Sequence, residues 1–233
     1  GFKSMEIPYK PYSFNLGRSG APMTAVALKT KYGSIKGFIE FLQGIGMDGV
    51  VSLYVNANDV ILDLLDVGKD PSLFFPAFED FIKEALDVIS EMGGEALVIS
   101  PTPEIGMIEK YIANDAEDWQ ESHSQKTIEL LSKMAGLASE RNIKLAVRND
   151  FWSLFRGTRI DKLMENADPR IQYSLDLAHV TISKVDPVKL VQKYRGRLGF
   201  IRFNDTAFDD REGNFKKIGA EVPQTGQQRV FND

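Results

Sequence analysis

The chain contains no cysteine and only two histidines among its 233 residues. The absence of cysteine excludes disulfides, thiolate catalysis, iron–sulfur clusters and cysteine-ligated zinc. The two histidines, His123 and His179, are too few for a histidine-rich metal cluster. A chain without cysteine fits the reducing cytoplasm, so we expect a cytoplasmic protein.

Long apolar runs and a basic charge balance are also missing. No stretch approaches the ~18–20 apolar residues that a membrane span needs, and residues 1–5 lack the apolar core of a signal peptide. The net charge is −5, from 28 Lys and Arg against 33 Asp and Glu. Because phosphate backbones bind basic surfaces, this balance argues against nucleic acid as the main partner. We therefore expect neither a membrane nor a nucleic-acid partner.

Short β-branched runs alternate with amphipathic segments along most of the chain, and this alternation predicts parallel strands joined by helices. The strands are expected at residues 12–16, 49–54, 96–100, 143–147, 171–175 and 198–203. The helices are expected at residues 34–45, 57–66, 73–92, 116–141, 158–167 and 188–194. No strand is evident between residues 55 and 72, and the tail after residue 205 is typical of a loop.

Several helix ends carry recognisable signals. Ser34 is an N-cap candidate for the helix that follows it. Asp186 followed by Pro187 predicts an N-cap and a first helical residue. Thr158 and Asp161 have the spacing of a capping box. These signals fix where we expect the intervening strands to end.

The strand–helix alternation is compatible with a closed barrel or with an open sheet. The chain has no Gly-x-Gly-x-x-Gly turn and no Gly-Lys-Ser/Thr loop, so the usual signals of a nucleotide-binding open sheet are missing. We expect a (β/α)8-type TIM barrel, incomplete or irregular at its third and last strands, formed as a single domain over residues 1–233. An open doubly wound sheet is the alternative.

Charged residues follow three successive predicted strands. Arg148, Asp176 and Arg202 are 28 and 26 residues apart, about the length of one strand–helix unit. Since barrel active sites lie at the carboxyl ends of the strands, these residues are expected to be neighbours on one rim. The candidate catalytic residues are Asp176, His179, Arg148 and Arg202, and the candidate substrate-binding residues are Asn149, Asp150, Trp152, Asn204 and Asp205.

The segments LAVRND, YSLDLAHV and FIRFNDT carry these residues and resemble the xylose-isomerase-like TIM-barrel family of sugar phosphate isomerases and epimerases. Members of that family typically have strands ending in Glu-Asn-His, Asp-x-x-His and His-x-Lys/Asn-Asp. A final glutamate completes their divalent metal site. The resemblance covers residues 34–206 and is best over residues 143–206.

The chain departs from the family at the metal ligands. Asp176 and His179 match, but Arg148 stands at the glutamate position and Arg202 at the histidine position. Two arginines in place of a glutamate and a histidine make such a site more positive, because arginine is always protonated. We therefore expect no bound Mn²⁺, Mg²⁺ or Zn²⁺; if a metal does bind, Asp176 is its first expected ligand. Past residue 205 the remaining glutamates are Glu212 and Glu221, which lie in loop-like sequence.

The resemblance implies an isomerase or epimerase that moves a proton next to the carbonyl of a small carbohydrate or hydroxy-carbonyl compound. An arginine would take over the electrostatic role of the metal, and Asp176 or His179 would move the proton. The alternative is a degenerate barrel in which Arg–Asp pairs neutralise the site and which binds a small anionic ligand or a protein partner. A missing last strand would leave an exposed sheet edge, which favours a homodimer or a covering segment.

Structural roles are also open for most of these residues. Asp176 is equally placed to cap a helix, and Trp152 to pack in the core. Arg148 and Arg202 would point to solvent if the strand ends were shifted by one or two residues. His123 lies on an outer helix and is expected to be exposed.

Overall fold

The structure is a computed structural model in which residues 3–11, 23–113, 116–206, 209–211 and 213 are described. The chain divides into two compact units. The first comprises Gly1–Ile99 and Lys133–Leu145, and the second comprises Ser100–Ser132 and Ala146–Asp233. The prediction of a single domain over residues 1–233 stays a prediction.

The described residues contain six strands separated by helices. The strands are β1 (Ser4–Pro8), β2 (Gly49–Asn56), β3 (Ala96–Ser100), β4 (Lys144–Arg148), β5 (Gln172–Asp176) and β6 (Leu198–Arg202). Their hydrogen-bonded order follows the sequence, β1-β2-β3-β4-β5-β6. The pairs β1–β2, β4–β5 and β5–β6 are parallel. This topology confirms the predicted α/β fold of TIM-barrel type, with fewer strands described than the eight of a complete barrel.

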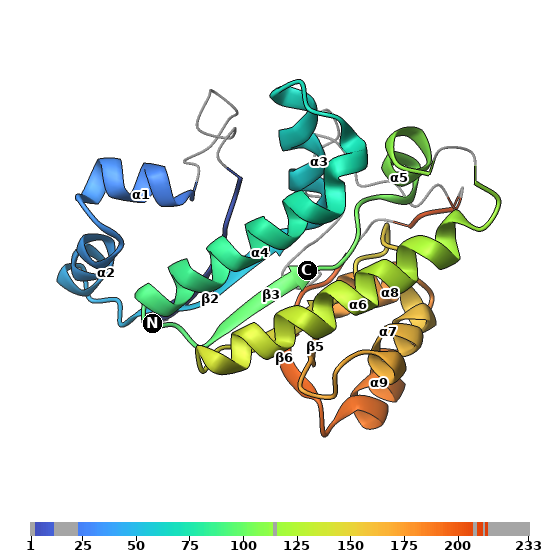
Figure 1. Ribbon diagram of the computed structural model, residues 1–233. Helices are drawn as coiled ribbons and strands as arrows, with labels where there is room; N and C mark the ends of the chain where they lie inside the picture. Colours follow the sequence, from blue (N-terminus) through green and yellow to red (C-terminus); the bar gives the residue numbers. More distant parts are fainter. Residues whose placement is uncertain (1–2, 12–22, 114–115, 207–208, 212, 214–233) are drawn as a thin grey trace. The chain divides into compact units, whose positions relative to one another are not determined.

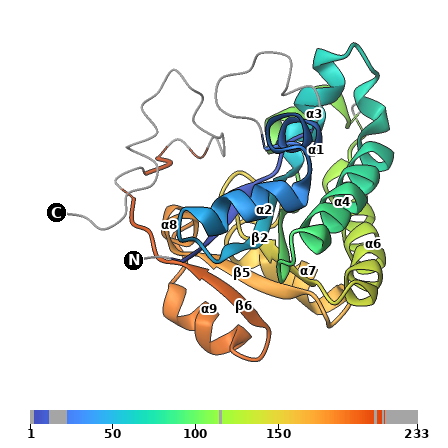
Figure 2. The ribbon, with the colours of Figure 1, turned by 90° about the vertical axis from the view of Figure 1, so that its left-hand side faces the viewer.

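The described helices include one in each range that the amphipathic pattern indicates, and three further helices, at residues 25–32, 105–111 and 177–182, were not predicted (Figures 1 and 2). They are α1 (Ala25–Tyr32), α2 (Ile35–Gly44), α3 (Ala57–Asp66), α4 (Phe74–Glu91), α5 (Ile105–Tyr111), α6 (Trp119–Glu140), α7 (Ile160–Asn166), α8 (Leu177–Ile182) and α9 (Pro187–Tyr194). Short 3-10 turns, η2 (Pro71–Leu73) and η3 (Gly157–Arg159), precede α4 and α7. In the described ranges, no helix has the length and apolar character needed to cross a membrane.

Two of the three predicted caps are confirmed. Ser34 Oγ accepts the Gly37 N–H at 2.8 Å, and Asp186 Oδ1 accepts the Val188 N–H at 2.8 Å. The capping box at Thr158 is wrong, because α7 begins without a side-chain cap. The 3-10 turn η3 includes Thr158, so this residue lies inside the turn and not at the N-cap position.

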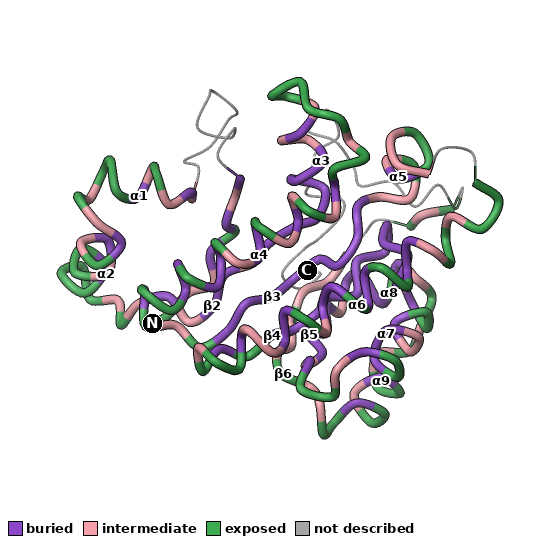
Figure 3. Tube along the Cα trace, viewed as in Figure 1, coloured by how far each residue is buried: buried purple, intermediate pink, exposed green. Residues whose placement is uncertain are grey.

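The core of the first unit forms between β2 and α4, which run side by side in Figure 1. The inward side chains of α4 repeat every three or four residues, and Figure 3 shows the buried stripe. Those with no exposed surface include Phe74, Phe78, Ile82, Leu86 and Ile89. Gly94 packs against β2 so closely that an added Cβ would lie 2.8 Å from the Val50 carbonyl oxygen. A side chain there would force β2 and α4 apart.

The first strand that the structure describes is not the predicted one. The predicted strand at residues 12–16 lies outside the described residues, whereas the segment Ser4–Pro8, for which no strand was predicted, forms β1. The third place in the sheet belongs to Ala96–Ser100, and residues 57–66 form α3. The gap in the strand series between residues 55 and 72 is therefore present in the structure, since this stretch holds no strand beyond the end of β2.

Candidate functional site

The strand register brings the candidate catalytic residues of the second unit onto one face of the sheet. Arg148 pairs with Ser174, and Asp176 pairs with Arg202. Paired residues of parallel strands project to the same side, and so do residues two apart on one strand. Arg148, Asp176 and Arg202 therefore share a face at the carboxyl ends of β4, β5 and β6.

Asp176 uses its two carboxylate oxygens differently. Oδ1 accepts the His179 N–H at 3.2 Å and so caps α8. Oδ2 is buried and has no hydrogen bond to any described residue. The alternative role of Asp176 as an N-cap thus accounts for Oδ1. The second oxygen is a buried acceptor with unused capacity, which is rare in a folded protein.

His179 is fully buried and held in one orientation. Its Nδ1 accepts the Phe151 N–H at 3.2 Å, so the proton of the neutral ring lies on Nε2. Nε2 is 3.7 Å from Asp150 Oδ1 and 3.9 Å from Asp176 Oδ2. The ring stacks on Phe151 and meets the edge of Trp152 at centroid distances of 5.5 Å and 4.8 Å. This environment points the Nε2–H toward the two carboxylates.

Arg148 forms a buried ion pair with Asp150. Its Nε and Nη2 lie 2.7 Å and 2.5 Å from Asp150 Oδ1. The Ser100 hydroxyl donates to the other oxygen of Asp150. Burial by itself raises the pKa of Asp150, but the charge of Arg148, the electrostatic effect of the nearby His179 and these hydrogen bonds outweigh it and lower the pKa. Asp150 is therefore a carboxylate at neutral pH.

Arg202 is the half-buried member of the group. Burial lowers the pKa of its guanidinium, although arginine stays protonated at neutral pH. It is the Cα partner of Asp176 in the β5–β6 ladder. The neighbouring residue Phe203 is 65% exposed, so the end of β6 reaches solvent. Of the two arginines, Arg202 is the one whose surroundings leave it near the surface.

The predicted substrate-binding residues Asn149, Asn204, Asp205 and Trp152 differ in what they contact. Asn149 holds the backbone of Asp176, since its Oδ1 accepts the Asp176 N–H at 3.0 Å and its Nδ2 donates to the Asp176 carbonyl at 3.3 Å. Asn204 Oδ1 accepts the Ala178 N–H at 3.1 Å, and Asp205 Oδ1 accepts the N–H of Thr206. Trp152 is buried in a cluster with Phe151 and Ile182. Asn149 and Asn204 therefore position the β5–α8 turn.

Two sequence-based interpretations are corrected. His123 is buried, not exposed, and burial together with the Lys126 charge lowers its pKa to about 4. The burial of His123 could have been predicted from the sequence, because His123 lies four residues before Thr127 and in phase with the buried stripe of α6. The solvent-facing alternative for Arg148 is also wrong, since its side chain is 5% exposed.

The sequence reasoning missed Ser100 and Thr102. Ser100 ends β3 and donates to Asp150, and the Thr102 hydroxyl lies 2.9 Å from the Ser153 hydroxyl. The strand-end rule that selected Arg148 and Asp176 also applies to β3, and it would have found Ser100.

The described residues do not fit a divalent metal. They contain no group of three histidine, aspartate or glutamate side chains placed to hold an ion. Two arginines flank Asp176 on the same sheet face, and the Asp150 carboxylate is already bound by Arg148. Glu212 and Glu221 lie outside the described residues.

Comparison with known proteins identifies inosose dehydratases as relatives. No protein-family model matches the chain. The chain is 31% identical over 133 residues to an inosose dehydratase of Clostridium tetani, an alignment of 55% of this chain and 44% of the relative. It is 25% identical over 139 residues to an inosose dehydratase of Clostridium beijerinckii, covering 57% and 47%. The chain thus spans less than half the length of the curated relatives that it matches.

Solved structures with a similar fold are sugar-converting enzymes by name. A sugar phosphate isomerase/epimerase from Parabacteroides distasonis has a TM-score of 0.59 at 17% identity, over 91% of this chain and 70% of that one. An L-ribulose 3-epimerase has a TM-score of 0.57 at 14% identity, over 86% and 59%. A D-allulose 3-epimerase from Methylomonas, in complex with D-allulose, has a TM-score of 0.55 at 16% identity, over 72% and 55%. At these identities the likeness concerns the fold.

Proposed function

We propose that this chain is a member of the xylose-isomerase-like TIM-barrel family and that it moves a proton next to the carbonyl of a small sugar or hydroxy-carbonyl compound. The observation that carries the proposal is the unbonded, buried Oδ2 of Asp176 beside His179 and Arg202. Epimerases and sugar dehydratases, the activities named for its relatives, share a first step in which a carbonyl-adjacent proton is removed. The proposal is therefore restricted to that step.

Asp176 is the proposed base. Its Oδ2 takes a proton from the carbon next to the carbonyl, and the C–H electrons form an enediolate. Arg202 lies next in register and stabilises the negative oxygen by a charge-assisted hydrogen bond. His179 points its Nε2–H at Asp176 and Asp150, and it is a positioning residue for the base. Return of the proton to the same carbon restores the carbonyl.

We propose further that this step proceeds without a divalent metal. The two arginines supply positive charge on the sheet face that carries Asp176, and the donor set does not suit a dication. A small-molecule carbohydrate is the proposed ligand. The homodimer and the cytoplasmic location stay predictions from the sequence.

A second function is a degenerate barrel that binds a small anionic ligand or a protein without catalysis. The Arg148–Asp150 ion pair favours it, because a guanidinium bound by a buried carboxylate is not available to a substrate. Proton transfer is the stronger proposal, because the pair does not involve Asp176 Oδ2. The two proposals differ in whether a C–H bond breaks.

Deuterium wash-in separates them. The full chain is incubated with a panel of ketoses and ketocyclitols in D₂O, and proton NMR follows the loss of the signals next to the carbonyl. This readout detects proton removal even when the product is unknown. We expect exchange on at least one compound and a loss of more than about a hundredfold in D176N, the range for removing a general base.

The D186N variant is the matched control. Asp186 also caps a helix through one carboxylate oxygen, and asparagine caps as well as aspartate does. D176N and D186N should therefore both keep their stability, and only D176N should lose exchange. Equal activity of the two variants would exclude Asp176 as the base, and no exchange in the wild type across the panel would favour the binding function.

A further inference from the structure

A cavity of ≈ 270 Å³ lies in the second unit, between the segment after β4 and the segment after α8. Its cationic lining residues are Arg156, Arg159 and Lys184, and its hydroxyl-bearing residues are Thr158 and Ser183. Phe151, Ile182 and Val185 form an apolar wall. Sites for small molecules begin at about 300 Å³, so this volume suits a small polar group with a few attached carbons.

The arginines of this cavity repel each other. Burial, and next the charge of Arg159, lower the pKa of Arg156 to about 10, while Asp210 acts in the opposite direction. The Arg159 side chain has no hydrogen bond or ion pair with any residue that the structure describes. Two neighbouring guanidiniums, of which Arg156 is half-buried and Arg159 is exposed, are stabilised by an anion between them.

A hydroxyl in the cavity lining is left without a partner. Ser183 Oγ is buried and has no hydrogen bond within the described part of the chain. Gly157 faces it with φ of +55°, and an added Cβ at Gly157 would lie 3.4 Å from Ser183 Cβ. Glycine at this position brings the 156–159 turn close to Ser183. The unused O–H is then a donor for an acceptor bound in the cavity.

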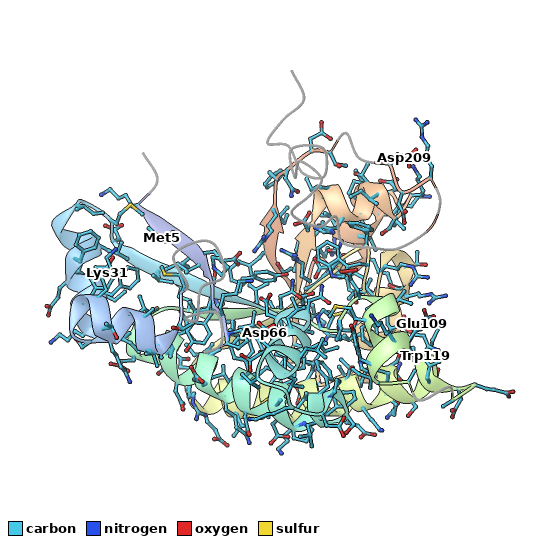
Figure 4. The ribbon with its side chains drawn as sticks, turned by 90° about the horizontal axis from the view of Figure 1, so that it is seen from above. Met5, Lys31, Asp66, Glu109, Trp119 and Asp209 are labelled. Carbon is cyan, nitrogen blue, oxygen red and sulfur yellow. The ribbon has the colours of Figure 1, made fainter. Side chains whose placement is uncertain are left out.

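Carboxylates partly neutralise the cavity. Asp210 is the acidic residue among the described lining residues, against three cations. Its neighbour Asp209, labelled in Figure 4, forms an ion pair with Lys184. Both acids lie in the segment after β6. The lining keeps an excess of positive charge even though the whole chain carries −5.

We propose that this cavity binds a phosphate group, either inorganic phosphate or the phosphate of a small monoester, through the Arg159 guanidinium and the Ser183 hydroxyl. Arginine recognises phosphate oxygens by paired hydrogen bonds, and the apolar wall suits the carbon skeleton of an ester. The Phe151 ring lines the cavity and stacks on His179, so one side chain separates the phosphate from the Asp176–His179 site. The assignment of this phosphate to the substrate rests on the proposed function. The phosphate site itself does not depend on the proposed function.

The test follows backbone amides of the nitrogen-15-labelled full chain by NMR. Inorganic phosphate, ribose 5-phosphate and ribose are titrated at constant ionic strength and about pH 7.5, where phosphate is mostly dianionic. We expect both phosphates to shift the amides of residues 156–159 and 183–185, and ribose to leave them unchanged. Tighter binding of ribose 5-phosphate identifies an ester as the ligand, and tighter binding of inorganic phosphate identifies the free ion.

Three variants make the assignment specific. R159Q should weaken phosphate binding about tenfold or more, because it removes a charged hydrogen-bond donor. R195Q is the matched control, since Arg195 is an exposed arginine outside the cavity lining. D210N removes the competing carboxylate and should tighten binding several-fold.

Shifts scattered over other surface cations, equal weakening by R159Q and R195Q, or binding of ribose as tight as that of ribose 5-phosphate would overturn the proposal. D176N separates this proposal from the proposed function. It should abolish deuterium exchange and leave phosphate binding unchanged.

Discussion

Arg148 and Asp150 form an ion pair that is almost fully enclosed, with Nη2 2.5 Å from Oδ1 and side-chain exposures of 5% and 0%. The sequence indicated Arg148 as a catalytic candidate and Asp150 as a substrate ligand. The structure makes them each other's partner, with Ser100 donating to the same carboxylate. Of the two candidate arginines, Arg202 is therefore the one near the surface.

Breaking this ion pair is expected to destabilise the fold strongly. R148M leaves the Asp150 carboxylate buried without its counter-charge, which costs about 3–5 kcal/mol in the free energy of unfolding. R148M/D150N removes the orphaned charge and should recover much of the loss. Because the pKa of Asp150 is lowered, its contribution is present above about pH 4, the unfolded value, and is lost at lower pH.

Urea denaturation measures these losses. R170M is the control, because Arg170 pairs with Asp168 at a side-chain exposure of 53% and should lose at most about 1 kcal/mol. Equal losses in R148M and R170M would contradict a structural role for the buried pair.

Asn149 is expected to act through Asp176. N149A leaves the buried N–H and carbonyl of Asp176 without their partners and should cost about 2–4 kcal/mol, the sum for two unsatisfied groups. N149D keeps the acceptor for the N–H but places a carboxylate against the Asp176 carbonyl, so it should also destabilise. N166A is the control, since the exposed Asn166 side chain donates to the Lys162 carbonyl within one helix. Thermal unfolding of N149A, N149D and N166A measures these losses of stability. An N149A variant as stable as the wild type would contradict the expected role of Asn149.

His123 is expected to make the free energy of unfolding depend on pH in the mildly acidic range. Its pKa falls from 6.5 to about 4 on folding, so the unfolded chain binds the proton more tightly. Stability is therefore complete above about pH 6.5 and decreases toward pH 4, by up to about 3 kcal/mol. In H123Q this contribution is absent. The difference in unfolding free energy between the wild type and H123Q should shrink as the pH falls, and a constant difference would rule out a buried neutral histidine.

Divalent metal is expected to bind weakly. After loading with Mn²⁺, Mg²⁺ or Zn²⁺ and removal of excess ion, elemental mass spectrometry should find much less than one ion per chain. The reason is that Arg202 adds positive charge to the sheet face of Asp176, and that the Asp150 carboxylate is already bound by Arg148. One retained ion per chain, lost in D176N, would contradict the argument and restore a metal-dependent site at Asp176.

The sequence by itself determined the elements whose signals are local. Ser34 and Asp186 cap their helices because a side-chain oxygen needs only the amides two or three residues ahead. The apolar stripe of α4 and the run of β3 are set by periodicity, which the chain carries without its neighbours. The fold class followed from the alternation of such elements.

Tertiary structure decided what depends on a neighbour distant in sequence. Asp150 and Ser100 are 50 residues apart, and only the packing of two strand ends joins them. His123 is buried because of what packs on α6, and burial, not residue type, sets its pKa. Asp176 was expected from its place after a strand. One of its oxygens caps a helix while the other stays unbonded. This difference depends on interatomic distances, which a pattern of residues does not specify.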